Sequence, residues 1–385
     1  MKILFLCGSL ESSKDGVGDY TRRLAGELVR QGHIVHLIAL HDHHIPVPSE
    51  NSQFDFETEI KCNRLPTDLT WNEKTLQVQK IIDNFNPQWI SVQYVPHSYH
   101  SKGLPFGLWK LLNSLNVGKS KWHLMLHELW VGELKSEGIK LQCIRYLEQI
   151  ILDRIIKCIN PSIIHTSNHL YKSYLFYRLN FISDILPVFS NIPEINTNNN
   201  FFTLNEKIKK IINNRNDYFI VTNFGSYYHK WWNLKKSIPS FISLAKNNKK
   251  KLVLASLGKL SIAEKKYWKD LSLNQSVEVL FLGIQSEQQI NIWLKKYTDL
   301  SVVTTPYLLL GKSGAFQAMK LFKVPVITLY KNFNYRIPIL FNESESDFYF
   351  LDDKNKIVKN TEKTDINSSL ENVAYQFLQA LQSQY

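Results

Sequence analysis

Short apolar runs alternate with amphipathic stretches from the start of the chain. Residues 3–7 form an apolar run typical of a buried strand, and apolar residues then recur at helical spacing from Tyr20 to Val29. The helical pattern ends at Gly32, and residues 34–40 form the next apolar run. The order strand, helix, strand predicts a βαβ unit, which implies a parallel sheet with a right-handed crossover.

The same alternation continues in two series that are separated by a polar stretch without periodicity. The last residues place apolar side chains on one helical stripe and predict a C-terminal helix, for which the first domain is one packing surface. We therefore predict an N-terminal Rossmann-like domain at residues 1–193, a linker at 194–202, a second Rossmann-like domain at 203–365, and the C-terminal helix at 366–385. Two doubly wound α/β domains of this kind are expected to face each other across a cleft.

Composition narrows the class of protein. The length of 385 residues suits two domains, and 46 basic against 34 acidic residues favour anionic partners such as nucleotide phosphates, acidic lipids or nucleic acid. Four widely spaced cysteines without a CxxC pair favour a reducing, cytoplasmic compartment. The first apolar run breaks at Gly8 without a cleavage site, and no run is long enough to span a bilayer, so any membrane contact is expected to be peripheral.

Two loops that follow predicted strands carry glycines near a helix N-terminus. Gly16, Val17 and Gly18 open the first helix, where backbone amides could approach a diphosphate, although a glycine turn without a ligand explains them equally well. The dinucleotide fingerprint is incomplete because Thr21 stands where its third glycine would be, which disfavours a nicotinamide enzyme. The second loop resembles the end of a P-loop but has Pro306 where that pattern needs glycine. Its members are suited to a phosphate or to sugar hydroxyls, with a plain helix cap by the serine as the alternative: Gly311, Lys312, Ser313 and Gly314.

Two further segments follow strands. Gly225, Ser226 and Lys230 lie in an aromatic-rich stretch, where the lysine could neutralise a leaving diphosphate or the aromatic residues could form an interdomain core. His127 could donate a hydrogen bond to a sugar hydroxyl, and Glu128 could be a base or a structural partner. The histidines at 41, 43 and 44 look metal-like, but their composition favours a solvated loop, so no metal site is predicted.

Together these segments resemble glycosyltransferase family 4, the retaining GT-B glycosyltransferases, over nearly the whole chain. Residues 16–25 are similar to that family's glycine loop and first helix, and residues 279–283, which end at Gly283, to the strand beside the donor base. The Gln-Ala-Met of residues 317–319 and the Pro-Val-Ile of residues 325–327 stand where members usually carry Glu-Ala-Met and Pro-Val-Ile. This chain departs from the family's usual pair of glutamates, because Leu309 and Gln317 occupy those two places.

The resemblance implies a mechanism and a set of roles. An acceptor hydroxyl attacks from the front face as the nucleotide diphosphate leaves, with no protein nucleophile, no cofactor and no metal required. Catalytic roles would fall to His127, Lys230 and Lys312, and acceptor-side contacts to Asp19, Tyr20 and Glu128. Donor binding would involve Gly16, Val17, Gly18, Gly225, Ser226, Gly283, Gly311, Ser313, Gly314 and Gln317.

The implied activity is transfer from a UDP- or GDP-sugar to a glycan or lipid-linked hydroxyl acceptor, in glycan or cell-envelope polysaccharide synthesis. A catalytically silent GT-B protein that binds sugar nucleotide or glycan is the alternative, because the glutamate pair is altered. A nucleic-acid binder is suggested by the pI near 9.3. Basic motifs interleaved with aromatic residues are missing from the sequence, so we expect no nucleic-acid partner.

Overall fold

The computed structural model of the chain describes residues 1–195, 206–225, 234–275, 277–329, 334–338, 348–351, 357–359 and 368–384. The chain divides into two compact units. The first contains Met1–Phe189, Phe333–Asn342 and Asn367–Tyr385, and the second contains Ser190–Asn332 and Glu343–Ile366. The described residues 334–338 thus belong with the first unit, whereas the sequence pattern places them in the second domain. The predicted linker lies outside the described residues from 196 onward.

The first unit is built on one twisted sheet, whose described strands follow the order β3-β4-β2-β1-β5-β6-β7-β8. All neighbouring strands are parallel except β3 and β4, which form an antiparallel hairpin at one edge. The strands are β1 (Lys2–Cys7), β2 (Ile34–Asp42), β3 (Ser49–Asp55), β4 (Thr58–Pro66), β5 (Trp89–Tyr94), β6 (Lys121–Leu126), β7 (Ile163–Thr166) and β8 (Asp184–Ile185).

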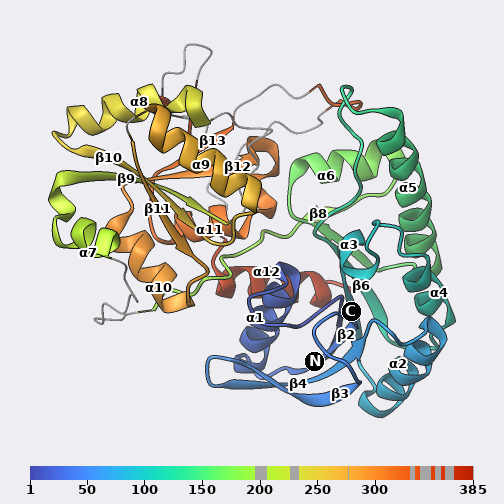
Figure 1. The fold of residues 1–385 in the computed structure, drawn as a ribbon. Helices are drawn as coiled ribbons and strands as arrows, with labels where there is room; N and C mark the ends of the chain where they lie inside the picture. The colour runs from blue at the N-terminus through green and yellow to red at the C-terminus, as the bar shows by residue number, and fades with distance from the viewer. Residues whose placement is uncertain are drawn as a thin grey trace. The chain divides into compact units, whose positions relative to one another are not determined.

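Helices cover both faces of this sheet, as Figure 1 shows for α1 and α12 on one side and α2, α4 and α5 on the other. The C-terminal helix α12 is amphipathic, and its buried stripe, including Phe377, packs with α1 and β1 in one hydrophobic core. The aromatic ring of Phe377 stacks on that of Phe5, with the ring centroids 5.8 Å apart. The helices are α1 (Gly16–Arg30), α2 (Trp71–Phe85), α3 (Pro96–Tyr99), α4 (Phe106–Ser114), α5 (Ile139–Ile159), α6 (His169–Tyr174) with a π-turn at Leu175–Leu179, and α12 (Leu370–Gln382).

The second unit repeats the architecture, with described strands in the order β11-β10-β9-β12-β13-β14-β15. Only the pairing of β14 with β15 is antiparallel among them. The strands are β9 (Tyr218–Phe224), β10 (Lys251–Leu257), β11 (Glu278–Gly283), β12 (Leu300–Pro306), β13 (Val326–Leu329), β14 (Phe348–Leu351) and β15 (Ile357–Lys359).

Two hydrophobic cores lie on opposite faces of the second sheet. Successive strand residues point to alternate faces, so Ile220 packs with α7, α10 and α11, while Val221 packs with α8 and α9. The predicted fold class is confirmed: each unit is a doubly wound α/β sheet of the Rossmann type. The helical segments are α7 (Glu206–Asn213), η2 (Arg215–Asp217), α8 (Leu234–Asn247), α9 (Ile262–Gln275), α10 (Glu287–Ile292) with a π-turn at Trp293–Tyr297, η4 (Tyr307–Lys312) and α11 (Gly314–Leu321).

Candidate functional site

Three glycines with left-handed backbone lie at the carboxyl ends of adjacent strands in the second unit. Gly225 follows β9, Gly258 follows β10 and Gly283 ends β11, with φ angles of +84°, +123° and +71°. The Gly225 amide donates to the carbonyl of Leu257, and the Gly258 amide donates to that of Gly283. These φ values disfavour any side chain, so this edge of the sheet consists of bare backbone that a ligand can approach closely.

The topology makes this edge the expected ligand site of the second unit. Strand β9 pairs with β10 on one side and with β12 on the other, so the connections after β9 and β12 leave in opposite directions. In open α/β sheets ligands bind beyond the carboxyl ends of the strands at such a switch point. Sequence reasoning identified Gly225 and Gly283 but missed Gly258, which was signalled only by a lone glycine after an apolar run.

The loop after β12 and the following helix α11 carry four of the ten predicted donor-binding residues: Gly311, Ser313, Gly314 and Gln317. Ser313 caps α11, its hydroxyl accepting from the amide of Phe316 at 3.2 Å. The Cβ of Ala315 lies 3.7 Å from the position that a Gly225 Cβ would occupy. The first turn of α11 therefore lies against the end of β9. The two residues that precede Ser313 differ in exposure: Lys312 is half-buried, whereas Gly311 is buried.

Gly314 and Gln317 complete this group. A Cβ on Gly314 would lie 3.7 Å from Nδ2 of Asn191, so the N-terminus of α11 lies next to the segment that follows Phe189. Gln317 is buried in the second turn of α11, and its amide donates to the Ser313 carbonyl at 3.0 Å. Leu309, at the other family glutamate position, is half-buried. Ser226 and Lys230 lie outside the described residues.

In the first unit, a carboxylate already occupies the N-terminus of α1. Asp15 is the helix cap, and its Oδ1 accepts from the Gly18 amide at 2.7 Å. Burial raises the pKa of Asp15, while hydrogen bonds from the amides of Gly18 and Val17 act to lower it. The amides that the sequence suggested for a diphosphate thus already donate to a side chain of this chain. The remaining predicted residue of the turn, Gly16, is exposed.

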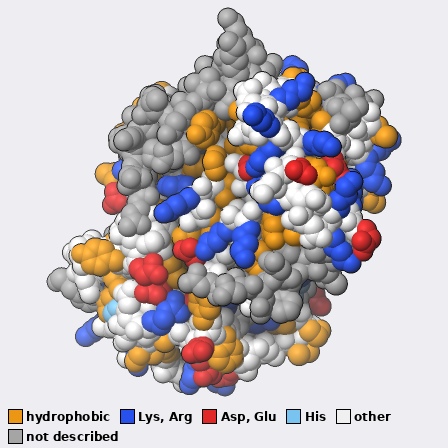
Figure 2. Space-filling view, turned by 90° about the vertical axis from the view of Figure 1, so that its left-hand side faces the viewer, with side chains coloured by type: hydrophobic (Ala, Val, Ile, Leu, Met, Phe, Trp, Pro, Cys, Tyr) orange, Lys and Arg blue, Asp and Glu red, His pale blue; other side chains and the backbone are white. Residues whose placement is uncertain are grey.

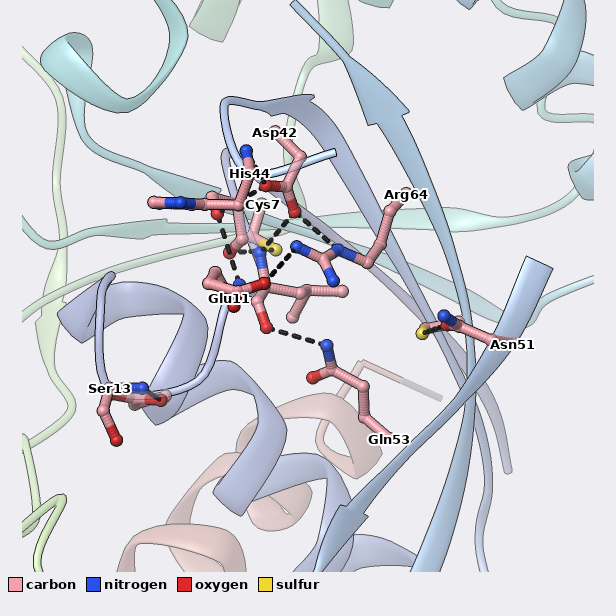
Figure 3. Close-up of polar contacts among 12 residues, drawn as sticks. Cys7, Glu11, Ser13, Asp42, His44, Asn51, Gln53 and Arg64 are labelled. Carbon is pink, nitrogen blue, oxygen red and sulfur yellow. Dashed lines mark hydrogen bonds and ion pairs between the residues drawn. The ribbon is translucent and has the colours of Figure 1, made fainter. Parts of the chain in front are cut away.

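A buried ion-pair network fixes the loop between β1 and α1. Arg64 on β4 donates through Nε to Asp42 at 2.7 Å, and through Nη2 to Glu11 at 2.7 Å (Figure 3). Asp42 in turn accepts from the Ser9 hydroxyl and from the Leu10 amide, both at 3.1 Å. The loop is therefore anchored to strands β2 and β4 at their carboxyl ends. Asp42 belongs to the histidine-rich run, so that run serves the loop structure.

Of the predicted acceptor-side residues, Tyr20 packs against His127, whereas Asp19 does not take part in this contact. The Tyr20 ring lies edge-on to His127 with centroids 4.8 Å apart and stacks on Phe189 at 4.6 Å. The phenol oxygen of Tyr20 is buried and has no hydrogen-bond partner among the described residues. Asp19 instead faces its own loop, accepting from the Ser13 amide at 3.1 Å and pairing with Arg22 at 2.5 Å.

His127 is buried at the carboxyl end of β6, and its Nε2 lies 2.8 Å from the amide oxygen Oε1 of Gln93. Burial lowers the pKa of His127 to about 3, so the ring is neutral at physiological pH. Because Nε2 donates to an oxygen, Nδ1 of the neutral ring is an acceptor. The predicted donation from His127 to a sugar hydroxyl is therefore inconsistent with this geometry, which offers an acceptor instead.

Glu148 on α5 is a titratable group that the sequence analysis missed. Its Oε2 accepts from the Val131 amide at 2.9 Å, whereas Oε1 is buried without a partner. Burial raises the pKa of Glu148 to about 7, the Val131 amide opposes the shift, and the charge of Glu128 adds to it. Half-buried Glu128 thus lies within electrostatic range of a second carboxylate.

Two negative findings concern the part of the chain that the structure describes. Within it, no group of three or more His, Cys, Asp or Glu side chains is arranged to hold a metal ion. No described helix combines the length and the apolar character needed to cross a membrane.

The face of the molecule drawn in Figure 2 carries Lys and Arg side chains more often than Asp and Glu. The lysine and asparagine tract at residues 247–251 lies in an exposed turn, as its composition predicts.

Comparison with known proteins gives a likeness in fold. No protein-family model and no curated protein sequence matches the chain. HepE from Anabaena, whose crystal structure contains UDP and glucose, is 15% identical with a TM-score of 0.52, over 99% of this chain and 91% of that one. The catalytic domain of starch synthase IV from Arabidopsis thaliana, bound to ADP and acarbose, is 12% identical with a TM-score of 0.56, over 100% and 99%. These likenesses show that the chain has the GT-B fold, with two Rossmann-like α/β units.

Proposed function

We propose that this protein is a glycosyltransferase that moves a sugar from a nucleotide diphosphate sugar to a hydroxyl acceptor with retention of the anomeric configuration. The observation that carries the proposal is the carboxyl edge of the second sheet, where Gly225, Gly258 and Gly283 have left-handed backbone and Gly225 lies against the first turn of α11. Bare backbone and a helix N-terminus are suited to a diphosphate. The UDP and ADP in the two similar structures support this choice of ligand class.

In this proposal, different residues of the second unit contact different parts of the bound nucleotide. Lys312 and the N-terminus of α11, with Gly311, Ser313 and Gly314, stabilise the charge that develops on the departing diphosphate. Gln317 hydrogen-bonds the ribose hydroxyls, which an amide can do as well as a carboxylate. Lys230 adds a second positive charge, and Ser226 a hydroxyl. Lysine charges and backbone dipoles can do this work, so the proposal requires no metal.

The first unit supplies contacts to sugar and acceptor. His127 accepts a hydrogen bond from a hydroxyl of the donor sugar, and Tyr20, Asp19 and Glu128 belong to the acceptor side. No protein nucleophile is needed if the acceptor attacks from the face that the diphosphate leaves, with a phosphate oxygen taking its proton. We further propose a glycan or lipid-linked acceptor and a cytoplasmic location with peripheral membrane contact, for which the excess of basic residues is the support.

A panel assay tests the activity. The full chain is incubated with UDP-glucose, UDP-N-acetylglucosamine, GDP-mannose and ADP-glucose, with and without oligosaccharide and polyprenyl acceptors, and released nucleoside diphosphate is measured. Acceptor-dependent release from one donor is expected, and NMR of the product should show the donor's anomeric configuration. A product with the inverted anomeric configuration would contradict the retaining mechanism but not the proposed sugar transfer.

A matched pair of variants tests the site. Gly225→Ala and Gly32→Ala place a methyl group at nearly the same backbone angles, with φ of +84° and +83°, and therefore carry similar strain. Only the first is expected to weaken UDP or ADP binding, by about tenfold or more. Equal affinities in the two variants would exclude this edge as the nucleotide site.

A protein that binds a sugar nucleotide without transferring its sugar is the second candidate. It is favoured by one observation: Leu309 and Gln317 stand where the resembled family has two glutamates. Calorimetry separates the candidates, since tight nucleotide-sugar binding with no release of diphosphate in any acceptor mixture supports the silent protein.

A further inference from the structure

A continuous chain of hydrogen bonds runs through the interior of the first sheet to His127. His127 Nε2 lies 2.8 Å from Gln93 Oε1, and Gln93 Nε2 donates to the Ser91 hydroxyl at 2.8 Å. The Ser91 oxygen lies 2.7 Å from Nδ1 of His123, whose Nε2 lies 3.0 Å from Nδ1 of His165. This series of hydrogen bonds crosses the adjacent strands β5, β6 and β7, and each of its five side chains is at most 6% exposed.

The hydrogen bonds of this chain share one direction. The amide nitrogen of Gln93 can only donate, so Ser91 accepts from it and has its own proton left for Nδ1 of His123. His123 then carries its proton on Nε2 and donates to Nδ1 of His165. At the other end, the amide oxygen of Gln93 can only accept, so His127 must carry its proton on Nε2.

We propose that Gln93, Ser91 and His123 are positioning residues that hold His127 in the tautomer protonated at Nε2, with Nδ1 as the hydrogen-bond acceptor for a ligand hydroxyl. The part that concerns the ligand rests on the proposed function, whereas the tautomer is a property of the protein alone. A sugar presents many hydroxyl donors, and a ring locked in one tautomer accepts from one of them without a reorganisation cost.

Aromatic rings pack against the histidines of this hydrogen-bond series and hold them in place. The Phe377 ring of α12 lies edge-on to His123 with centroids 5.0 Å apart, and Tyr20 lies edge-on to His127. Burial, together with the neighbouring His165 and His127, lowers the pKa of His123 well below its usual range, and burial lowers that of His165 to about 4. The rings therefore stay neutral and each keeps one proton to donate.

Long-range proton–nitrogen NMR spectra of the full chain labelled with ¹⁵N-histidine test the tautomer directly. The His127 signals are assigned by their loss in His127→Asn, and protonated Nε2 with unprotonated Nδ1 is expected from pH 8 to pH 6. Gln93→Leu and the milder Ser91→Ala should each give His127 a second tautomer, and Gln93→Glu, which keeps the accepting oxygen, should restore a single one. His36 is the internal control, because its Nε2 contacts Asn63 Oδ1 at 2.6 Å outside the chain and its signals should not change.

Two results would overturn the proposal. One is a wild-type His127 protonated at Nδ1, and the other is an unchanged tautomer in both Gln93→Leu and Ser91→Ala when the His36 signals show a folded protein. If Gln93→Leu does not fold, Ser91→Ala alone decides.

A binding measurement then extends the test to the ligand. Gln93→Leu should weaken UDP-glucose or GDP-mannose about tenfold and leave UDP or GDP unchanged, because His127 is assigned to the sugar and not to the nucleotide. A sugar nucleotide bound with unchanged affinity overturns the assignment to the ligand. If the wild type binds no sugar nucleotide, the proposed function fails, while the NMR result still decides whether the chain fixes the tautomer.

Discussion

Asp42 on β2 and Arg64 on β4 form a buried ion pair, with Nε of the guanidinium 2.7 Å from Oδ2 of the carboxylate. The Asp42 side chain is 0% exposed and that of Arg64 is 10% exposed. Both also bond to residues of the loop after β1, so the pair connects that loop to two strands. A contact between residues 22 positions apart thus sets the shape of the segment leading to α1.

Replacement of Arg64 by Met should destabilise the first unit by about 3–5 kcal/mol, because it leaves the Asp42 carboxylate buried without its partner. Burial opposes ionisation of Asp42, but hydrogen bonds from Arg64, Leu10 and His44 outweigh it and lower the pKa. A lowered carboxyl pKa adds stability above the unfolded pKa that is lost as the pH falls through the folded value. Urea unfolding of wild type and Arg64→Met should therefore differ most at neutral pH.

The control for this substitution is Lys157→Met. Lys157 pairs with Asp153 at 2.8 Å, but its side chain is 67% exposed, so its loss should cost less than about 1 kcal/mol. Similar losses in the two variants would show that the Asp42 pair does not anchor the loop.

Glu148 should make the protein less stable as the pH rises from 4.5 to 7. Its pKa is raised to about 7 from the ordinary 4.5 by burial, against the Val131 amide and with the help of Glu128. For a raised pKa the favourable contribution is complete below the unfolded value and is lost as the pH passes the folded value. Each pKa unit corresponds to about 1.4 kcal/mol, so the total loss is on the order of 3 kcal/mol.

Glu148→Gln tests this, because glutamine can still accept from Val131 but carries no charge. Denaturant unfolding should show equal stabilities at pH 4.5 and a more stable variant at pH 8. The exposed Glu371→Gln on the first turn of α12 should shift stability without such a pH dependence. A Glu148→Gln difference that is constant with pH would contradict the buried ionisation.

The sequence pattern revealed the parallel core of both sheets but not their edges. Apolar runs such as residues 3–7 and 218–224 are buried on both faces, which makes them visible without any turn signal. The β3–β4 hairpin was not predicted, because β3 is almost entirely polar and lacks an apolar run. Its turn also lacks the Asn-Gly type of signal, since Phe56 itself adopts a positive φ of 53°.

The candidate site was predicted where chemistry follows from position alone. Gly225 was predicted because it follows a buried strand, and Gly283 was predicted from the resemblance of residues 279–283 to the family's strand beside the donor base. Partners supplied by distant segments could not be foreseen, as the hydrogen bond between His127 and Gln93 and the burial of Glu148 illustrate. In the second case the only signal was one acidic residue on the stripe that buries Ile151 and Leu152.

Gly18→Ala should destabilise the first unit by about 1–3 kcal/mol, because the added Cβ would overlap the backbone carbonyl of Ser9. That carbonyl belongs to the loop held by Asp42, so it cannot yield freely. Gly138→Ala is the matched control, since Gly138 has no atom within 4 Å of the added Cβ. Thermal melts of both variants check this, and equal melting temperatures would contradict the close approach at Gly18.

Lys312→Ala should reduce transfer by two to three orders of magnitude and leave the melting temperature nearly unchanged. Loss of a preorganised donor to developing charge costs about 10²–10³ in rate, and the residue is half-buried at the N-terminus of α11 without belonging to either core of the second unit. Lys266→Ala, exposed on α9 of the same unit, removes the same charge away from the switch point and should keep full activity. Lys312→Arg should recover part of the rate, because the positive charge remains. Near-normal turnover in Lys312→Ala would mean that the diphosphate charge is stabilised elsewhere, and a parallel loss in Lys266→Ala would mean that net charge alone matters.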